Sequence, residues 1–246
     1  MKIQNPEILL ETPDLLAINK PAGLMVHADG RSTEPTLADW LLETYPKMAM
    51  VGDAHILPRG EEVPRPGIVH RLDRETSGVM VIAKNRKTFL YLQEQFQGRE
   101  VEKIYNAFVY GFMDEKDGTI DRPIARNKKD FRLWSAQRGA RGDAREAVTE
   151  YKVLATTEKL SFVELTPRTG RTHQIRVHLK AINHPVVADR LYAPKMPAEL
   201  GFERLALHAK SLSFKDVKGK ALLVEAPYPA DFKKALITFE KLEARG

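Results

Sequence analysis

Two short segments concentrate the side chains that could do chemistry. The first runs from His70 to Gly78 and reads HRLDRETSG, with five potentially charged residues between two apolar stretches. The second runs from Thr169 to His178 and reads TGRTHQIRVH. A loop held between elements of a rigid scaffold is a common place for reactive groups. In the second segment a loop leads into an expected helix, so that Arg171 at its start suits an anion or a carboxylate partner.

A simpler interpretation exists for each segment. The first could be a solvated turn in which an aspartate and an arginine pair with each other, an interaction worth little at a surface. In the second, Thr172 could serve only as a helix cap, with the remaining residues forming an ordinary polar helix face. Residue types alone leave these interpretations open.

Both segments resemble the RluA family of RNA pseudouridine synthases. The family pattern H-R-L-D-x-x-T-S-G is present as His70 to Gly78, and T-G-R-x-H-Q-[IL]-R-V-H as Thr169 to His178. Three shorter blocks agree as well, and all five follow the family's order along the chain: Asn19-Lys20-Pro21-x-Gly23, Lys103-x-Tyr105 and Leu207-His208-Ala209. Two positions depart from the pattern. Ala188 stands where the family has a glycine before Asp189, and Lys215-Asp216 replaces a His-Pro pair.

The resemblance implies isomerisation of uridine to pseudouridine in structured ribosomal or transfer RNA. The N1–C1′ bond breaks, the uracil turns, and C5 bonds to C1′, so that no cofactor is required. Asp73 is then the catalytic carboxylate and acts on a nucleotide flipped out of its stack. The carboxylate could attack C1′ or remove a proton from C2′, and the sequence leaves both routes open.

Two further catalytic residues follow from the resemblance. Arg171 is expected to pair with the carboxylate of Asp73 and to keep it ionised. Tyr105 is expected to stack on the extruded uracil and to serve as a general acid or base through its hydroxyl. Without the resemblance, Tyr105 would be interpreted as a core residue of a strand.

Substrate binding is expected from residues beside the catalytic ones and from a basic segment. By the resemblance, Arg71 fills the gap left by the flipped nucleotide or contacts a phosphate, while Leu72 and Ile175 line the uracil pocket. Residues 122–142 hold seven cations and one acid, with Phe131 and Trp134 among them. This combination favours a loop that binds RNA phosphates and stacks on bases, although a charge run is also typical of a solvated face. The expected RNA contacts there are Arg126, Lys128, Lys129 and Arg132.

The elements that must position these residues predict an α+β fold with a mostly antiparallel sheet and a central active-site cleft. Strands outnumber helices and do not alternate with them regularly. Residues 51–67 carry three prolines and are expected to form a long exposed loop. The expected strands are 8–10, 15–18, 24–26, 68–69, 78–83, 103–110, 147–155, 160–165, 205–214 and 221–224. The expected helices are 36–42, 87–96, 172–181 and one that begins at Pro229.

Composition narrows the classes of protein further. The chain has 246 residues, 39 Lys plus Arg against 33 Asp plus Glu, and a net charge of +6, which favours a polyanionic partner. It has no cysteine, which excludes disulfides and thiolate metal sites and fits a cytoplasmic protein. No apolar run reaches the roughly 18–20 residues of a membrane span. The expectation is one catalytic domain over residues 1–246, without a separate N-terminal RNA-binding domain, metal, cofactor, membrane contact or obligatory protein partner, acting as a monomer.

Two other classes of function remain open. A catalytically silent RNA-binding protein of the same fold would be marked by loss of Asp73 or Tyr105, and both are present. A glycoside hydrolase would need a second carboxylate roughly 5–10 Å from the first. Glu75 is the nearest candidate in sequence, but it stands at a position that the family pattern leaves variable.

Overall fold

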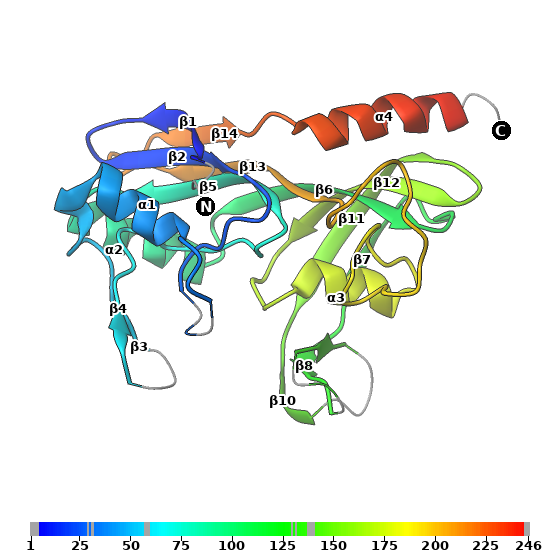
Figure 1. Cartoon of the computed structure of the whole chain (residues 1–246), viewed down its shortest axis with the longest axis horizontal. Coiled ribbons are helices and arrows are strands. Elements are labelled where there is room, and N and C mark those ends of the chain that lie inside the picture. The colour runs from blue at the N-terminus through cyan, green and yellow to red at the C-terminus, as the bar shows by residue number, and fades with distance from the viewer. Residues whose placement is uncertain are drawn as a thin grey trace. The chain divides into compact units, whose positions relative to one another are not determined.

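The computed structural model describes residues 5–28, 30, 32–56, 60–128, 130, 132–136 and 141–243. It divides into two compact units. Unit 1 comprises Met1–Glu102 and Lys210–Pro227, and unit 2 comprises Lys103–Ala209 and Tyr228–Gly246 (Figure 1). The expectation of a single catalytic domain over residues 1–246 stays a prediction, and the two units are described separately.

Unit 1 contains a sheet with the strand order β1-β2-β5-β13, and β14 pairs with β13. Neighbours β1 and β2, β2 and β5, and β13 and β14 are antiparallel. Every residue of β5 is buried, as expected for an apolar run covered on both faces. The strands are β1 (Glu7–Glu11), β2 (Leu15–Lys20), β5 (Ser77–Ala83), β13 (Leu207–Lys215, whose first three residues belong to unit 2) and β14 (Ala221–Glu225).

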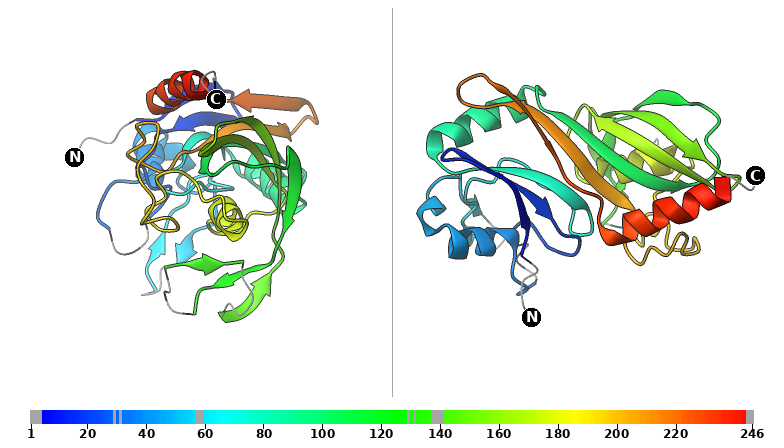
Figure 2. Two further views of the ribbon diagram at one scale, coloured as in Figure 1. Left: turned by 90° about the vertical axis from the view of Figure 1, so that its right-hand side faces the viewer. Right: turned by 90° about the horizontal axis from the view of Figure 1, so that it is seen from above.

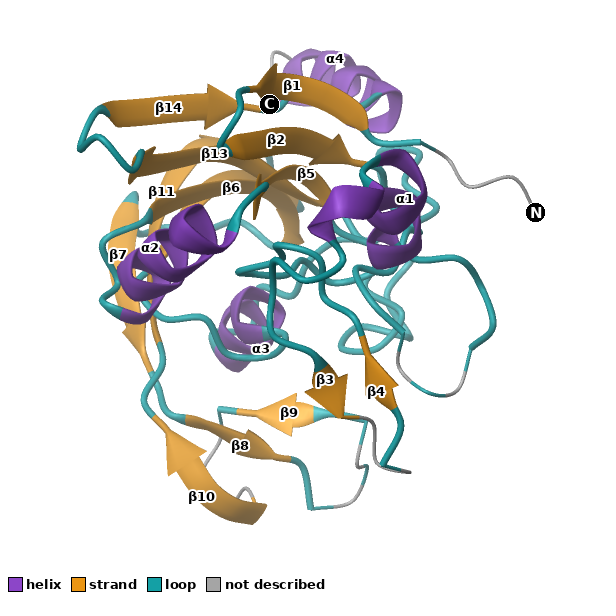
Figure 3. Ribbon diagram, turned by 90° about the vertical axis from the view of Figure 1, so that its left-hand side faces the viewer, coloured by secondary structure: helices purple, strands orange, loops and turns teal. Residues whose placement is uncertain are grey.

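Local capping fixes where the two helices of unit 1 begin. Helix α1 (Leu37–Thr44) begins with a capping box, in which Thr36 accepts from the N–H of Asp39 while Asp39 accepts from the N–H of Thr36. Helix α2 (Arg86–Gln97, Figure 3) has Asn85 as its N-cap. The side chain of Asn85 accepts from the N–H of Thr88 at 2.9 Å. Both expected helices are therefore confirmed.

Three expectations for unit 1 were wrong in part. Residues 24–26 form no strand, because the carbonyls of Met25 and Val26 accept from the first free N–H groups of α1. Residues 68–69 form only an isolated bridge, Ile68 to Ile82. The expected loop 51–67 contains the strand pair β3 (His55–Ile56) and β4 (Glu62–Val63), and a 3-10 turn, η1 (Pro46–Met48), precedes it.

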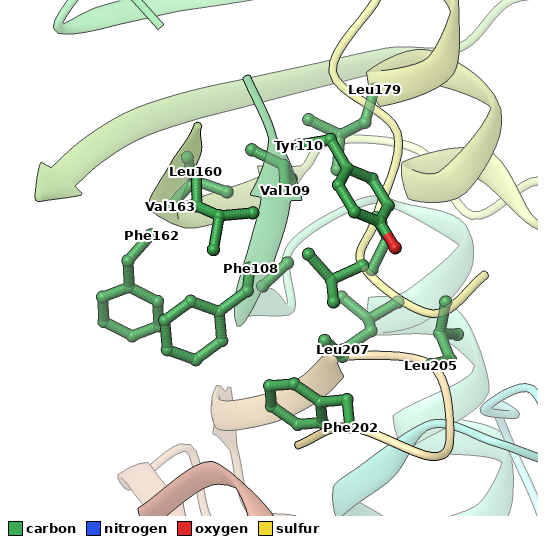
Figure 4. Packing of buried hydrophobic residues seen from close by; sticks show 14 of the residues in the cluster. Phe108, Val109, Tyr110, Leu160, Phe162, Val163, Leu179, Phe202, Leu205 and Leu207 are labelled. Carbon is green, nitrogen blue, oxygen red and sulfur yellow. The ribbon is translucent and has the colours of Figure 1, made fainter. Parts of the chain in front are cut away.

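Unit 2 contains an antiparallel sheet with the order β6-β12-β11-β7. Helix α4 lies along this sheet (Figures 1 and 2) and packs onto it through Phe232 and Phe239. Their rings lie 5.7 and 5.4 Å from the ring of Phe108. Phe108 packs in this core together with Phe162 and Phe202 (Figure 4). The elements are β6 (Glu102–Tyr110), β7 (Asp117–Asp121), β11 (Val148–Thr156), β12 (Leu160–Pro167), α3 (Gln174–Ala181) and α4 (Ala230–Glu243).

The basic segment of unit 2 is a small sheet, which corrects the expectation of a loop. Its strands are β8 (Ile124–Arg126), β9 (Trp134–Ser135) and β10 (Arg141–Arg145), in the order β10-β8-β9 (Figure 3). We call residues 122–145 the basic arm. Lys129, Phe131 and Arg138 of the arm lie outside the described residues.

The prediction of an α+β fold with mostly antiparallel strands is confirmed by this topology. None of the helices in the described part of the chain is long and apolar enough to span a bilayer.

Ala188 occupies a backbone conformation that favours glycine, with φ of 57°. It stands where the family pattern has glycine, so the departure noted in the sequence carries a conformational cost. A left-handed alanine costs about 1 kcal/mol relative to a right-handed one. We expect Ala188→Gly to raise the free energy of unfolding by about 1 kcal/mol, measured by urea denaturation.

Ala198 provides the matched control, because it lies in the same connection and has no positive φ. Ala198→Gly should leave the stability unchanged or lower it. Equal effects of the two substitutions would contradict the conformational explanation.

Candidate active site

Asp73 of unit 1 lies in a turn immediately before the buried strand β5. The carbonyl of Asp73 accepts from the N–H of Thr76 at 3.1 Å, and Thr76 and Ser77 are each 2% exposed. Leu72, which precedes Asp73, is 4% exposed and packs in the core. Asp73 itself is half-buried, whereas Arg71 is exposed. The turn thus holds one carboxylate at the edge of the core, as a catalytic or binding group requires.

The buried side chain of Lys20 holds the Asp73 turn in place. Its side chain is fully buried, and its Nζ donates to the carbonyls of Pro21, Leu24 and Arg74 at 2.8, 2.8 and 3.1 Å. A second link joins the same segments, because the N–H of Gly23 donates to the carbonyl of Arg74 at 2.8 Å. The Asn19–Gly23 block therefore supports the Asp73 turn. The sequence marked Lys20 only as part of a motif and gave no sign of its partners.

His70 has a structural role in unit 1. Its Nε2 accepts from the N–H of Val81 in β5 at 3.0 Å. Its ring stacks on Phe96 of α2 with the centroids 4.5 Å apart. The ring nitrogen that faces β5 is thus occupied, and the side chain links the Asp73 segment to the strand and the helix.

Tyr105 and Arg171 belong to unit 2. Tyr105 pairs with Leu165 in the β6–β12 register and is half-buried against the core. Arg171 is half-buried, and its Nε donates to the carbonyl of Glu146 at 3.0 Å. Because Asp73 lies in unit 1, the expected pairing of Arg171 with Asp73 stays a prediction. Ile175 is 7% exposed, near the start of α3, and packs in the core.

Gln174 holds the loop that carries Arg171. Its side chain is 4% exposed and uses both ends of the amide. Oε1 accepts from the hydroxyl of Thr169 at 2.7 Å and from the N–H of Arg171 at 3.0 Å. Nε2 donates to the carbonyl of Val148 at 2.9 Å and to the hydroxyl of Thr149 at 3.0 Å. Thr172 caps nothing here, because the helix begins after His173, which has a left-handed φ of 56°.

His178 continues this chain of hydrogen bonds. Its Nε2 lies 2.9 Å from the carbonyl of Arg122, and its Nδ1 lies 2.9 Å from the hydroxyl of Thr149. Because a carbonyl can only accept, Nε2 donates, and in the neutral ring Nδ1 then accepts from the hydroxyl. Burial lowers the pKa of His178 and favours this neutral form. The ring therefore links α3 to the base of the basic arm.

An ion pair and one tyrosine complete the support of α3 and the arm. Arg176 and Asp189 form a buried bidentate pair at 2.7 and 2.8 Å. Asp189 also accepts from the N–H of Tyr192 at 3.0 Å. The hydroxyl of Tyr192 accepts from the N–H of Trp134 in β9 at 3.1 Å and lies 2.9 Å from Nδ1 of His173. The second motif thus serves mostly to place α3 and the arm.

The expected RNA contacts on the arm have different surroundings. The guanidinium of Arg126 lies over the ring of Trp134, 4.2 Å from its centroid. Lys128 is exposed. Arg132 is engaged in a bidentate ion pair with Asp130, which lowers the pKa of that carboxyl to about 2. In the part of the chain that the structure describes, no group of three or more His, Asp or Glu side chains could hold a metal ion.

The Lys20 contacts lead to a stability prediction. Lys20→Met keeps the apolar stem but leaves three carbonyls without their donor, and each orphaned acceptor costs roughly 1–3 kcal/mol. We expect a loss of about 3 kcal/mol in the free energy of unfolding, measured by urea denaturation. Lys47→Met, at an exposed position of the same unit, should be neutral. A Lys20→Met protein as stable as the Lys47→Met protein would contradict the anchoring role.

Comparisons with known proteins agree with this arrangement. The family model for RNA pseudouridylate synthases matches residues 14–181. The ribosomal large subunit pseudouridine synthase D of Xanthomonas campestris is 39% identical over 250 residues, covering 97% of this chain and 70% of the relative. An RNA pseudouridine synthase of Aquifex aeolicus is 40% identical, covering 95% of this chain and 73% of the relative.

Solved structures give the same result for the fold. The human RNA pseudouridylate synthase domain containing 4 superposes with a TM-score of 0.73 at 29% identity, covering 95% of this chain and 93% of that chain. The human RNA pseudouridylate synthase domain containing 1 gives 0.73 at 28% identity, covering 93% and 86%. With a family match over most of its length and relatives near 40% identity, the chain belongs to the RNA pseudouridine synthases, which are isomerases.

Proposed function

We propose that this protein converts specific uridines of ribosomal or transfer RNA to pseudouridine with Asp73 as the catalytic carboxylate. The observation that carries the proposal is the setting of Asp73. It is a half-buried carboxylate in a turn that Lys20 ties to the core on one side and β5 continues on the other. Such a fixed group can act repeatedly at one atom of a bound nucleotide, because its orientation is set before the substrate binds.

The step itself is an internal rearrangement of the nucleoside. The carboxylate of Asp73 either attacks C1′ as the N1–C1′ bond breaks or removes a proton from C2′. The released uracil then turns and bonds through C5 to C1′. On the first route this bond displaces the carboxylate of Asp73 from C1′, and on the second the removed proton returns to C2′. The proton on C5 leaves to a base, and N1, freed from C1′, gains a proton. Atoms and electrons balance without an oxidant or cofactor. In the proposal, Arg171 keeps the carboxylate ionised, and Tyr105 stacks on the uracil and transfers a proton.

Binding of RNA is assigned to the basic arm and to residues beside Asp73. Arg126 and Lys128 offer cations on the arm, and the ring of Trp134 offers a stacking surface. Arg71, Leu72 and Ile175 are proposed to contact the flipped nucleotide. One relative is named for the large ribosomal subunit, so ribosomal RNA is the first candidate substrate and transfer RNA the second. The proposed compartment is the cytoplasm.

The central test compares Asp73→Asn with the native protein on large-subunit ribosomal RNA and on transfer RNA, with nucleosides analysed after digestion. We expect pseudouridine with the native protein and none with Asp73→Asn, whose RNA affinity should be unchanged. Arg171→Ala should lower the rate by about 100-fold or more, as loss of a catalytic partner does. Arg168→Ala is the control, because Arg168 pairs at the surface with Glu150.

An active Asp73→Asn protein, or an Arg171→Ala protein as fast as Arg168→Ala, would refute these assignments. RNA binding without any pseudouridine from the native protein would favour a silent binding protein instead. Release of free uracil would favour hydrolysis.

The basic arm gives a separate prediction. Replacing Arg126 and Lys128 together with glutamine should weaken RNA binding and flatten the salt dependence of the binding constant. Each lost phosphate contact lowers the slope of log K against log salt by about 0.7–0.9. Lys152→Gln with Lys159→Gln makes the same charge change at exposed positions of unit 2 outside the arm. Equal slopes for the two double variants, measured by fluorescence anisotropy, would remove the arm from the binding surface.

A further inference from the structure

Two arginine side chains of unit 1 approach the same imidazole nitrogen of His27. Nη2 of Arg65 lies 3.1 Å and Nη1 of Arg71 lies 3.3 Å from Nε2 of His27. A guanidinium group can only donate hydrogen bonds, so Nε2 accepts from both arginines and carries no proton. Two positive charges therefore converge on the lone pair of one ring.

Among the described residues, neither arginine of this cluster contacts an acid. In the part of the chain that the structure describes, the contacts of the two guanidinium groups are those with His27. Arg74 and Arg86 of the same unit, by contrast, pair with Glu34 and Asp53. Two guanidinium groups held together, with no counterion among the described residues, form an arrangement that an anion would stabilise.

Arg65 is the less exposed of the two arginines, because it is half-buried whereas Arg71 is exposed. Within the described residues its Nε is buried and has no hydrogen-bond partner. Burial, and then the positive charge of Arg71, lower the pKa of Arg65. A buried donor without an acceptor destabilises the folded protein, and such a cost is often retained where a ligand supplies the acceptor.

The backbone around Arg65 is fixed by two close approaches. A Cβ atom at Gly52 would lie 1.9 Å from the carbonyl oxygen of Arg65. Gly67 has a φ of +66°, and a Cβ there would lie 1.9 Å from the carbonyl oxygen of Ala83 at the end of β5. The N–H of Ala83 donates to the carbonyl of Gly67 at 2.9 Å. Arg65 therefore projects from a segment pressed directly onto the core.

The other two members are also on fixed segments. Arg71 lies between the anchored residues His70 and Leu72, and it precedes Asp73 by two positions. His27 follows Val26, whose carbonyl accepts from the N–H of Ala38 at the start of α1. Three rigid segments thus present the cluster, which meets the requirement of a preorganised binding site.

We propose that Arg65, Arg71 and His27 form a binding site for one backbone phosphate of the RNA substrate. Arg71 places this site two positions along the chain from Asp73. This inference rests on the proposed function and adds Arg65 and His27 to it. The phosphate oxygens accept from the two guanidinium groups, in bidentate fashion where a group presents two N–H bonds. His27 holds both arginines in place in the absence of RNA and so reduces the entropy that they lose on binding.

The test measures affinity for a labelled RNA stem-loop with uridines in its loop, at several salt concentrations. Arg65→Gln should weaken binding about 10-fold and reduce the salt slope by about 0.7–0.9. Arg86→Gln removes the same charge from an exposed surface pair of unit 1 and is the matched control. Arg71→Gln changes an exposed side chain and gives a second variant if Arg65→Gln fails to fold. Slopes equal to that of Arg86→Gln in both variants would overturn the site.

Nitrogen NMR of the His27 ring distinguishes RNA from a free anion. In the protein alone Nε2 should be unprotonated, and its resonance should shift when the RNA stem-loop is added. A shift with inorganic phosphate and none with RNA would overturn the RNA assignment in favour of a free-anion site.

The two proposals can fail separately. Normal pseudouridine formation with an unchanged salt slope in Arg65→Gln would overturn the phosphate site and leave the catalytic assignment standing. If the salt slope depends on Arg65 but the native protein forms no pseudouridine, the phosphate site would stand and the catalytic assignment would be overturned.

Discussion

The buried ammonium group of Lys20 is the interaction on which the Asp73 turn depends. Moving such a charge out of water costs several kcal/mol, so it remains buried only where strong acceptors surround it. Here three carbonyls do so, and they belong to the loop after β2 and to the residue after Asp73. If the turn moved, the fully buried ammonium would lose the carbonyl of Arg74 as an acceptor. The desolvation cost therefore becomes a restraint on the position of the catalytic candidate.

In unit 2, neutral side chains hold the loop that carries Arg171 in place. Gln174, Thr149 and His178 form one directed chain, from an amide donor through a hydroxyl to an imidazole that donates to a carbonyl. Each member accepts a hydrogen bond on one side and donates one on the other, so the network fixes both the loop of Arg171 and the base of the basic arm. A neutral network suits this place, because a second buried cation beside Arg176 would need a further acid.

The sequence predicted the fold well where periodicity or caps were strong and poorly where they were not. The α1 and α2 helices and most long strands were found because their buried faces repeat at the expected spacing. The strands of the basic arm were missed for two reasons. Their cations hide a period of two, and their apolar side chains Ile124 and Trp134 pack in a cluster with Tyr192, which is more than 50 positions away. Residues 24–26 were assigned wrongly because an apolar triplet can equally cap a helix.

For the site, motifs located the residues but not their partners. Lys20 meets a carbonyl 54 positions along the chain, and no local pattern encodes that distance. The family pattern marked Ala188 as a departure, and only its left-handed backbone explains why glycine is the usual residue.

The net charge of the chain also predicts a kind of partner without identifying the residues that bind it. A surplus of six positive charges favours a polyanion, but it does not say which cations are available to bind one. Arg132 stands among the arm's cations and is neutralised by Asp130, two positions earlier. Arg65 lies between two prolines and belongs to no run of charged residues, so the sequence does not mark it as a binding residue. In the fold it shares the imidazole nitrogen of His27 with a second guanidinium group, that of Arg71. What makes an arginine available for phosphate is the absence of a nearby acid in space, and that is a property of the folded chain.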